Sequence, residues 1–126
     1  DVYDATFYDS DRIAIMPMGF CYPGKGKSGD LPPRLECADT WHEHLLACIP
    51  NIEFTLLLIN TLNPLLGIER KATVTETVQD WQTYAPDRLP MPQPSPRNNL
   101  WLRKNLWFEA EVVPFLQQRM KRLVGT

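Results

Sequence analysis

The chain has 126 residues, 44% of them apolar, and a formal net charge of −2 at pH 7. This length supports one compact domain with a sizeable core and excludes two. The charge excludes a generally basic surface, although a local basic patch can still bind phosphates. No run of about 18 or more uncharged apolar residues is present, so the sequence predicts a soluble protein without a membrane-spanning helix.

The amino end of the chain and its cysteines give expectations about processing and about the cellular compartment. No charged-then-apolar leader is seen, and Asp1 is not an initiator methionine, so we expect a chain that was cut or processed and lacks an upstream segment. The 3 cysteines have no dense disulfide-type spacing. This usage favours a reducing cytoplasm.

The first predicted element is a short buried strand over residues 12–17, RIAIMP, where β-branched residues precede a proline that cannot donate to a sheet ladder. Residues 21–34, CYPGKGKSGDLPPR, follow, and their glycines and prolines predict a solvated loop. A loop this long in a small domain is usually functional or disordered.

A helix and a strand are predicted next. Asp39 is the expected N-cap, and Pro50 ends the helix. Residues 53–60, EFTLLLIN, form an apolar run typical of a strand buried on both faces of a parallel sheet. The expected apolar face of the helix consists of Trp41, Leu45, Cys48 and Ile49.

The second half of the chain predicts two further helices and a strand. Residues 73–76, TVTE, form a capping-box pattern that opens a helix with Val74, Val78 and Trp81 inward. Residues 89–94, LPMPQP, predict a short strand. The last helix tolerates Pro114 only near a first turn or at a kink. Its apolar positions at helical spacing are Phe108, Val112, Leu116, Met120 and Leu123.

Strands that alternate with helices predict an α/β fold with a parallel sheet and crossover helices. Only about three strands can be counted, which fits a chain that has lost an amino-terminal strand. Whether this strand exists upstream decides how the sheet closes.

Three groups of polar residues are candidates for chemistry. His42 and His44 lie two apart on a predicted helix, so they cannot hold one metal together and we expect both to face solvent. The GKGKSG stretch at 24–29 lacks the spacing of a phosphate-binding P-loop. Its Lys25 and Lys27, with Arg34, either pair with a phosphate backbone or form a merely solvated loop.

The QPSPRNN stretch at residues 93–99 is the strongest candidate for a binding element. Its alternating prolines fix the backbone and predict a stiff, exposed turn. Ser95, Arg97 and the two asparagines offer hydrogen-bonding groups to phosphates or base edges. The alternative is an ordinary proline-rich connection.

Three stretches resemble the bacterial uracil-DNA glycosylase superfamily, in particular its iron-sulfur-type members and their uncharacterised relatives. They are PMGFCYPGKGKSGDLPPRLEC at 17–37, PSPRNN at 94–99 and WLRKNLWFEAEVVP at 101–114. The resemblance covers nearly the whole chain as a single domain. It implies a three-layer fold, with a four-stranded parallel sheet between helices and DNA across the carboxyl ends of the strands. The first strand would be missing from this chain.

The resemblance implies a DNA repair hydrolase of base excision repair, which flips uracil or another damaged base out of the stack and hydrolyses its N-glycosidic bond. Family members carry histidine where this chain has Gln93, and that side chain donates a hydrogen bond to the uracil oxygen that gains charge. Gln93 is therefore the expected catalytic residue. The expected DNA-binding residues are Pro94, Ser95, Pro96, Arg97, Asn98, Lys25 and Lys27.

The chain also departs from the family pattern. Relatives carry upstream a C-x-x-C pair and a G-[QE]-x-P-G loop that positions the attacking water, and neither is in this sequence. Pro17 stands where iron-sulfur members place an asparagine that reads uracil. Residues 58–61, LINT, replace a sequence like VGQYA.

Cys21 and Cys37 have the separation of the third and fourth ligands of the family's 4Fe-4S cluster, with fifteen residues between them. Such a cluster needs four thiolates, so this chain holds no cofactor unless residues outside it complete the set. A disulfide or two buried free thiols are expected instead. The alternative to an enzyme is a catalytically inactive DNA-binding or assembly module, whose open sheet edge accepts a partner chain or a second copy.

Overall fold

The structure, a computed structural model, describes residues 2–59 and 73–125. The chain forms two compact units. The sheet unit is Pro17–Pro92, and the terminal unit combines Asp1–Met16 with Gln93–Thr126. The expectation of one domain stays a prediction.

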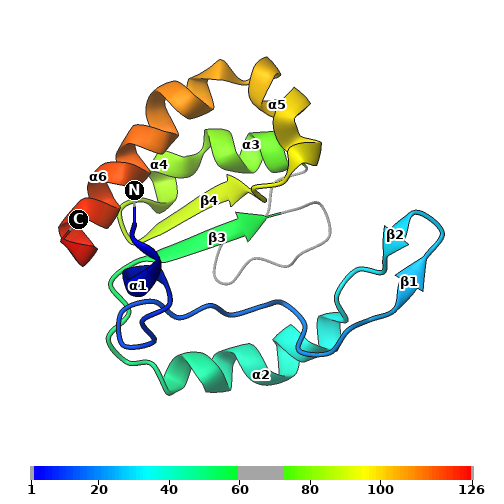
Figure 1. Ribbon diagram of the computed structural model, residues 1–126. Helices are drawn as coiled ribbons and strands as arrows, with labels where there is room; N and C mark the ends of the chain where they lie inside the picture. The colour runs from blue at the N-terminus through cyan, green and yellow to red at the C-terminus, as the bar shows by residue number, and fades with distance from the viewer. Residues whose placement is uncertain (1, 60–72, 126) are drawn as a thin grey trace. The chain divides into compact units, whose positions relative to one another are not determined.

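The sheet unit is built on two parallel strands, β3 (Thr55–Ile59) and β4 (Arg88–Pro92). Leu56 lies opposite Leu89 in the register, and both arrows point the same way in Figure 1. Parallel neighbours need a long crossover, which here carries a helical segment. The predicted α/β class and the parallel pairing are confirmed.

The strand predicted over residues 12–17 is wrong, because these residues have no strand structure. The start of the segment closes a local turn instead. The backbone N–H groups of Arg12 and Ile13 both donate to the carbonyl of Asp9, at 3.0 and 2.9 Å. These local hydrogen bonds compete with pairing in a sheet, since each backbone group has one donor to give.

β3 is buried on one face only, which corrects the prediction of burial on both faces. Leu57 and Ile59 are buried, whereas Leu56 and Leu58 are 39% and 45% exposed. Alternate side chains of a strand point to opposite faces. The apolar run therefore gave β3 two apolar faces, and the fold buries only one of them.

The helix predicted after Thr73 is confirmed as α3 (Val74–Gln79). The hydroxyl oxygen of Thr73 accepts a hydrogen bond from the N–H of Glu76 at 3.1 Å, as an N-cap does. A second short helix, α4 (Trp81–Tyr84), follows at once. Val78 and Trp81 are buried, as predicted, and Val74 is half-buried.

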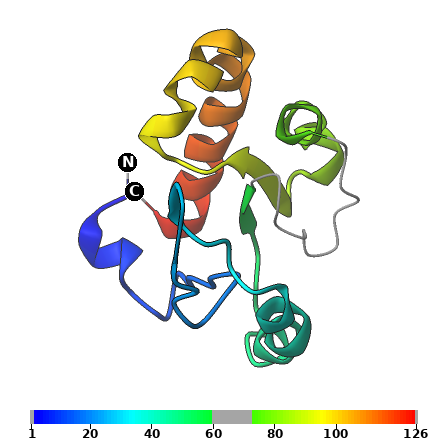
Figure 2. The same cartoon turned by 90° about the vertical axis from the view of Figure 1, so that its right-hand side faces the viewer.

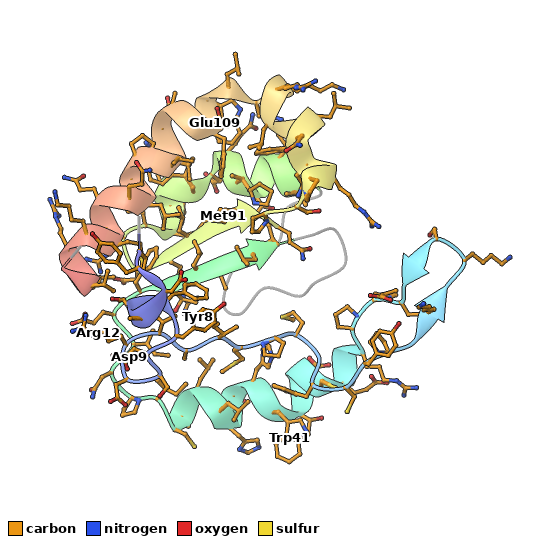
Figure 3. The ribbon with its side chains drawn as sticks, in the orientation of Figure 1. Tyr8, Asp9, Arg12, Trp41, Met91 and Glu109 are labelled. Carbon is orange, nitrogen blue, oxygen red and sulfur yellow. The ribbon has the colours of Figure 1, made fainter. Side chains whose placement is uncertain are left out.

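Helix α2 (Leu35–Ala47) begins before the predicted cap, with Arg34 at the N-cap position, so the assignment of Asp39 as N-cap is wrong. Its predicted apolar face is also wrong. Trp41 is 55% exposed, and its side chain points away from the strands in Figure 3. Within the sheet unit, the strand pair lies between α2 on one side and α3 with α4 on the other (Figure 1, Figure 2).

The terminal unit is helical. Its carboxyl-terminal helix is confirmed, with a π-helical stretch, η2 (Phe108–Val112), that continues into α6 (Val113–Val124). Pro114 is the second residue of α6, directly after the π-helical stretch. A proline inside a helix removes a backbone hydrogen bond, so it is tolerated best where the regular α-helical pattern is already interrupted. The other elements are α1 (Asp4–Phe7), a 3-10 turn η1 (Pro96–Asn98) and α5 (Asn99–Lys104).

The amino-terminal part of this unit is joined to its last helix. Arg12 donates to the carbonyl oxygen of Val124 at 3.4 Å and lies 3.6 Å from the carboxylate of Asp9 (Figure 3). Gly125, with φ 72°, ends α6 in the left-handed conformation that glycine adopts without strain. Among the described residues, no helix is long and apolar enough to cross a membrane.

Candidate nucleic-acid interface

The QPSPRNN loop is a hydrogen-bonded turn. The hydroxyl oxygen of Ser95 accepts from the N–H of Arg97 at 3.3 Å, and the N–H of Asn98 donates to the carbonyl of Ser95 at 2.9 Å. The amide nitrogen of Asn98 also donates to the backbone carbonyl of Gln93. These bonds close residues 93–98 into one turn that runs directly into α5. A stiff turn agrees with the prediction from the prolines.

The side chains of this loop have two different environments. Ser95 and Asn98 are half-buried and spend hydrogen-bonding groups within the loop. Gln93 and Arg97 are exposed, together with both prolines and Asn99. The loop therefore exposes Gln93 and Arg97 to solvent, while Ser95 and Asn98 hold its backbone. Sequence reasoning did not separate these two roles.

An aromatic cluster joins α5, which follows the loop, to the residues at the start of the next helix. The Trp101 ring lies edge-to-face with Trp107 at 6.0 Å and with Phe108 at 5.4 Å between centroids. Asn105 joins these partners, because its amide nitrogen donates to the carbonyl of Trp101 at 2.8 Å and its amide oxygen accepts from the Trp107 indole at 3.2 Å. Sequence reasoning missed Asn105, although an asparagine between two helical runs is a typical turn signal.

The second basic element is a hairpin in place of the fully irregular loop that was predicted. Strands β1 (Lys25–Gly26) and β2 (Gly29–Asp30) pair antiparallel, with Lys25 opposite Asp30. The Tyr22 hydroxyl donates to a carboxylate oxygen of Asp30 at 2.8 Å. Lys25 and Lys27 are exposed. Figure 1 shows the hairpin extending beyond the amino-terminal end of α2.

The hydrogen bond to Asp30 raises the pKa of the Tyr22 phenol, because ionisation breaks the bond and places two negative charges side by side. Desolvation adds to the rise. A raised folded-state pKa means that this contact stabilises the hairpin below the ordinary tyrosine value of about 10 and is lost as pH rises through the higher folded value.

We therefore expect Tyr22 to ionise later than a free tyrosine. Ultraviolet titration of tyrosinate in the protein and in Tyr22→Phe gives its transition by difference. Asp30→Asn should bring that transition back toward the ordinary value. An unchanged transition in Asp30→Asn would contradict the hydrogen-bonded assignment.

His42 does not face solvent as predicted. It is 2% exposed, and its Nε2 donates to the carbonyl oxygen of Pro17 at 2.8 Å. A carbonyl only accepts, so Nε2 carries the proton. The ring of Phe20 packs edge-on to His42 at 5.9 Å. His42 thus anchors the segment that enters the hairpin, whereas His44 is exposed as predicted.

The cysteines do not fit a complete iron-sulfur site. Cys21, Cys37 and Cys48 are free thiols, so the disulfide alternative is wrong. Cys21 is exposed and Cys37 half-buried, so the pair is not buried either. In residues 2–59 and 73–125, no group of three or more potential ligands could hold a metal ion. Cys21 and Cys37 supply only two of the four thiolates that a cluster needs.

The candidate residues fall into two sets. The loop at 93–98 belongs to the terminal unit, and the hairpin with Lys25 and Lys27 belongs to the sheet unit. Of the departure at 58–61, Asn60 and Thr61 lie outside the described residues. No protein-family model matches the chain.

Proposed function

We propose that the protein is a uracil-DNA glycosylase-like DNA repair protein with the three-layer α/β fold of that superfamily. The observation that carries the proposal is the position of the QPSPRNN turn. Gln93 follows directly on Pro92, the last residue of the parallel strand β4. Ligands of open α/β sheets bind outside the carboxyl ends of the strands. A stiff turn with an exposed amide and an exposed guanidinium at this point suits DNA.

The proposed chemistry is hydrolysis of the N-glycosidic bond of a flipped base. The bond between the base nitrogen and C1′ breaks, water delivers its hydroxyl to C1′, and its proton goes to the departing base. Negative charge gathers on a uracil oxygen, and the Gln93 amide donates a hydrogen bond to it. Arg97, Lys25 and Lys27 neutralise phosphates. Ser95 holds the turn that carries Arg97.

Turnover tests this proposal. The protein is incubated with a duplex oligonucleotide that contains one uracil, and abasic sites are then cleaved with alkali. We expect cleavage at the uracil and none in the matched oligonucleotide with thymine at that position. Failure to cleave at high protein concentration, while the same duplex is bound, would reject the enzyme and leave DNA binding intact.

A second candidate is an inactive DNA-binding or assembly module. It is favoured by the partly exposed Leu56 and Leu58 on β3, and by the absence of a third strand beside β3 and β4 among the described residues. An unpaired strand edge is a template for another chain. A homodimer in sedimentation analysis, together with no uracil release in the cleavage assay, would support this candidate. The cytoplasmic location of the protein stays a prediction.

A further inference from the structure

The hairpin presents an aromatic ring that is held at one end and open on its surface. Tyr22 is 66% exposed, yet its hydroxyl is fixed by Asp30 at 2.8 Å. Its neighbour two residues earlier, Phe20, is anchored against the buried His42. The ring of Tyr22 therefore has little rotamer freedom to lose when a flat ligand covers it.

The hairpin backbone is ordered by contacts of its own. The N–H of Leu31 donates to the carbonyl of Gly24 at 2.8 Å. The Leu31 side chain lies over Gly26, where an added Cβ would meet its Cδ2 at 3.0 Å. Gly24 and Gly29 have φ of 99° and 128°, which other residues rarely adopt. The backbone of this hairpin requires glycine at these positions. The segment that carries Tyr22 is therefore ordered by its own local contacts.

The hairpin region that carries Tyr22 has more basic than acidic side chains. Residues 20–34 contain three basic side chains, and Asp30 is the only acidic one. Asp30 accepts the Tyr22 hydroxyl, so part of its hydrogen-bonding capacity is used inside the hairpin. Lys25 lies opposite Asp30, and Lys27 stands in the two-residue turn between Gly26 and Gly29. A preorganised aromatic face on the same hairpin as two exposed lysines suits the alternation of bases and phosphates in a single strand.

We propose that this hairpin binds unpaired nucleotides, with one base stacked on the exposed face of Tyr22 and with Lys25 and Lys27 at neighbouring phosphates. This proposal rests on the proposed function, since it names the single-stranded form of DNA that the protein holds. Stacking is tolerant of sequence because every base has a π-face. The hairpin would thus hold the DNA strand that flanks the target base, without selecting its sequence.

Fluorescence anisotropy with a labelled oligo-dT strand measures this binding. We expect Tyr22→Ala to weaken affinity roughly five-fold or more, the low end for one base–aromatic stack. Tyr22→Phe keeps the ring, so its affinity for the strand should fall much less. Tyr8→Ala is the matched control, because Tyr8 is also highly exposed but packs against Phe7 in the terminal unit.

Two further measurements separate stacking from charge. An oligomer with abasic sugars in place of thymidines keeps the phosphates, so Tyr22→Ala should bind it as the unmodified protein does. The slope of log affinity against log salt should stay unchanged in Tyr22→Ala and fall by about 0.7 for each of Lys25→Gln and Lys27→Gln. Circular dichroism checks that the variants are folded.

The outcomes distinguish this proposal from the glycosylase. Equal affinity of Tyr22→Ala and the unmodified protein for oligo-dT overturns the hairpin proposal, even if uracil is released. Tyr22-dependent binding without uracil release supports the hairpin and rejects the enzyme. Failure of the unmodified protein to bind either single-stranded or duplex DNA overturns both.

Discussion

Replacing Gln93 by histidine is expected to raise the rate of uracil release by about a hundred-fold. One well-placed donor to a developing oxyanion is worth roughly a hundred- to a thousand-fold in rate. The Gln93 amide is expected to supply only part of this, because its donor lies at a different place from that of an imidazole. The rate on a uracil-containing duplex under single-turnover conditions measures the gain.

The structure explains why this substitution leaves the loop intact. Asn98 donates to the backbone carbonyl of Gln93, so the bond survives a change of side chain. The side chain of Gln93 is exposed and has room for a ring. Gln93→Ala serves as control and should lower the rate below that of the unmodified protein. If Gln93→His is no faster than Gln93→Ala, residue 93 does not face the base.

The pH profile gives a second readout on the same variant. In the proposed mechanism the introduced imidazole acts as a neutral donor, so the gain of Gln93→His should grow as pH rises through the ordinary imidazole pKa of about 6.5. The amide of Gln93 does not titrate. The ratio of the two rates should therefore increase with pH, and a constant ratio would contradict a role for a neutral imidazole.

Leu89→Ala is expected to cost about 2–5 kcal/mol of the free energy of unfolding, because it removes a buried side chain and leaves a cavity. Leu89 is 0% exposed in β4. Small domains have only about 5–15 kcal/mol of stability in total, so this change lowers the urea midpoint sharply. Urea unfolding followed by circular dichroism measures the loss.

Leu56→Ala is the matched control for this experiment. Leu56 lies directly opposite Leu89 in the parallel register but is partly exposed. The same three carbon atoms are removed, so the difference between the two variants reports burial alone. Equal losses would show that Leu56 is covered in solution, as the assembly module with a second copy predicts.

Much of the local structure could be predicted from neighbouring residues. The Thr73 cap depends on a side chain and an N–H three residues away, and both are written in TVTE. The turn at 93–98 follows in the same way from two prolines with a serine between them and an asparagine after them. Pro114 was expected near a first turn or at a kink, and it lies where the π-helical stretch passes into α6. These features need no distant partner, so they can be predicted from a short stretch of sequence.

Other features depended on residues far away in the chain. Helical spacing on α2 marked an apolar stripe through Trp41, but the fold buries the neighbouring stripe, where His42 meets Pro17, 25 residues earlier. The run at 55–59 showed two apolar faces and could not show which one is covered. Residues 12–17 had the composition of a strand, whereas local turns hold the start of that segment.

The sequence by itself determined the helix and turn signals, the α/β class with parallel strands, and the residues that resemble a glycosylase. Only the tertiary structure decided which faces are buried and that Tyr22 is held open on a hairpin. The physical reason is that caps and turns are contacts within a few residues. Burial instead is a property of surfaces that meet only after distant segments have packed.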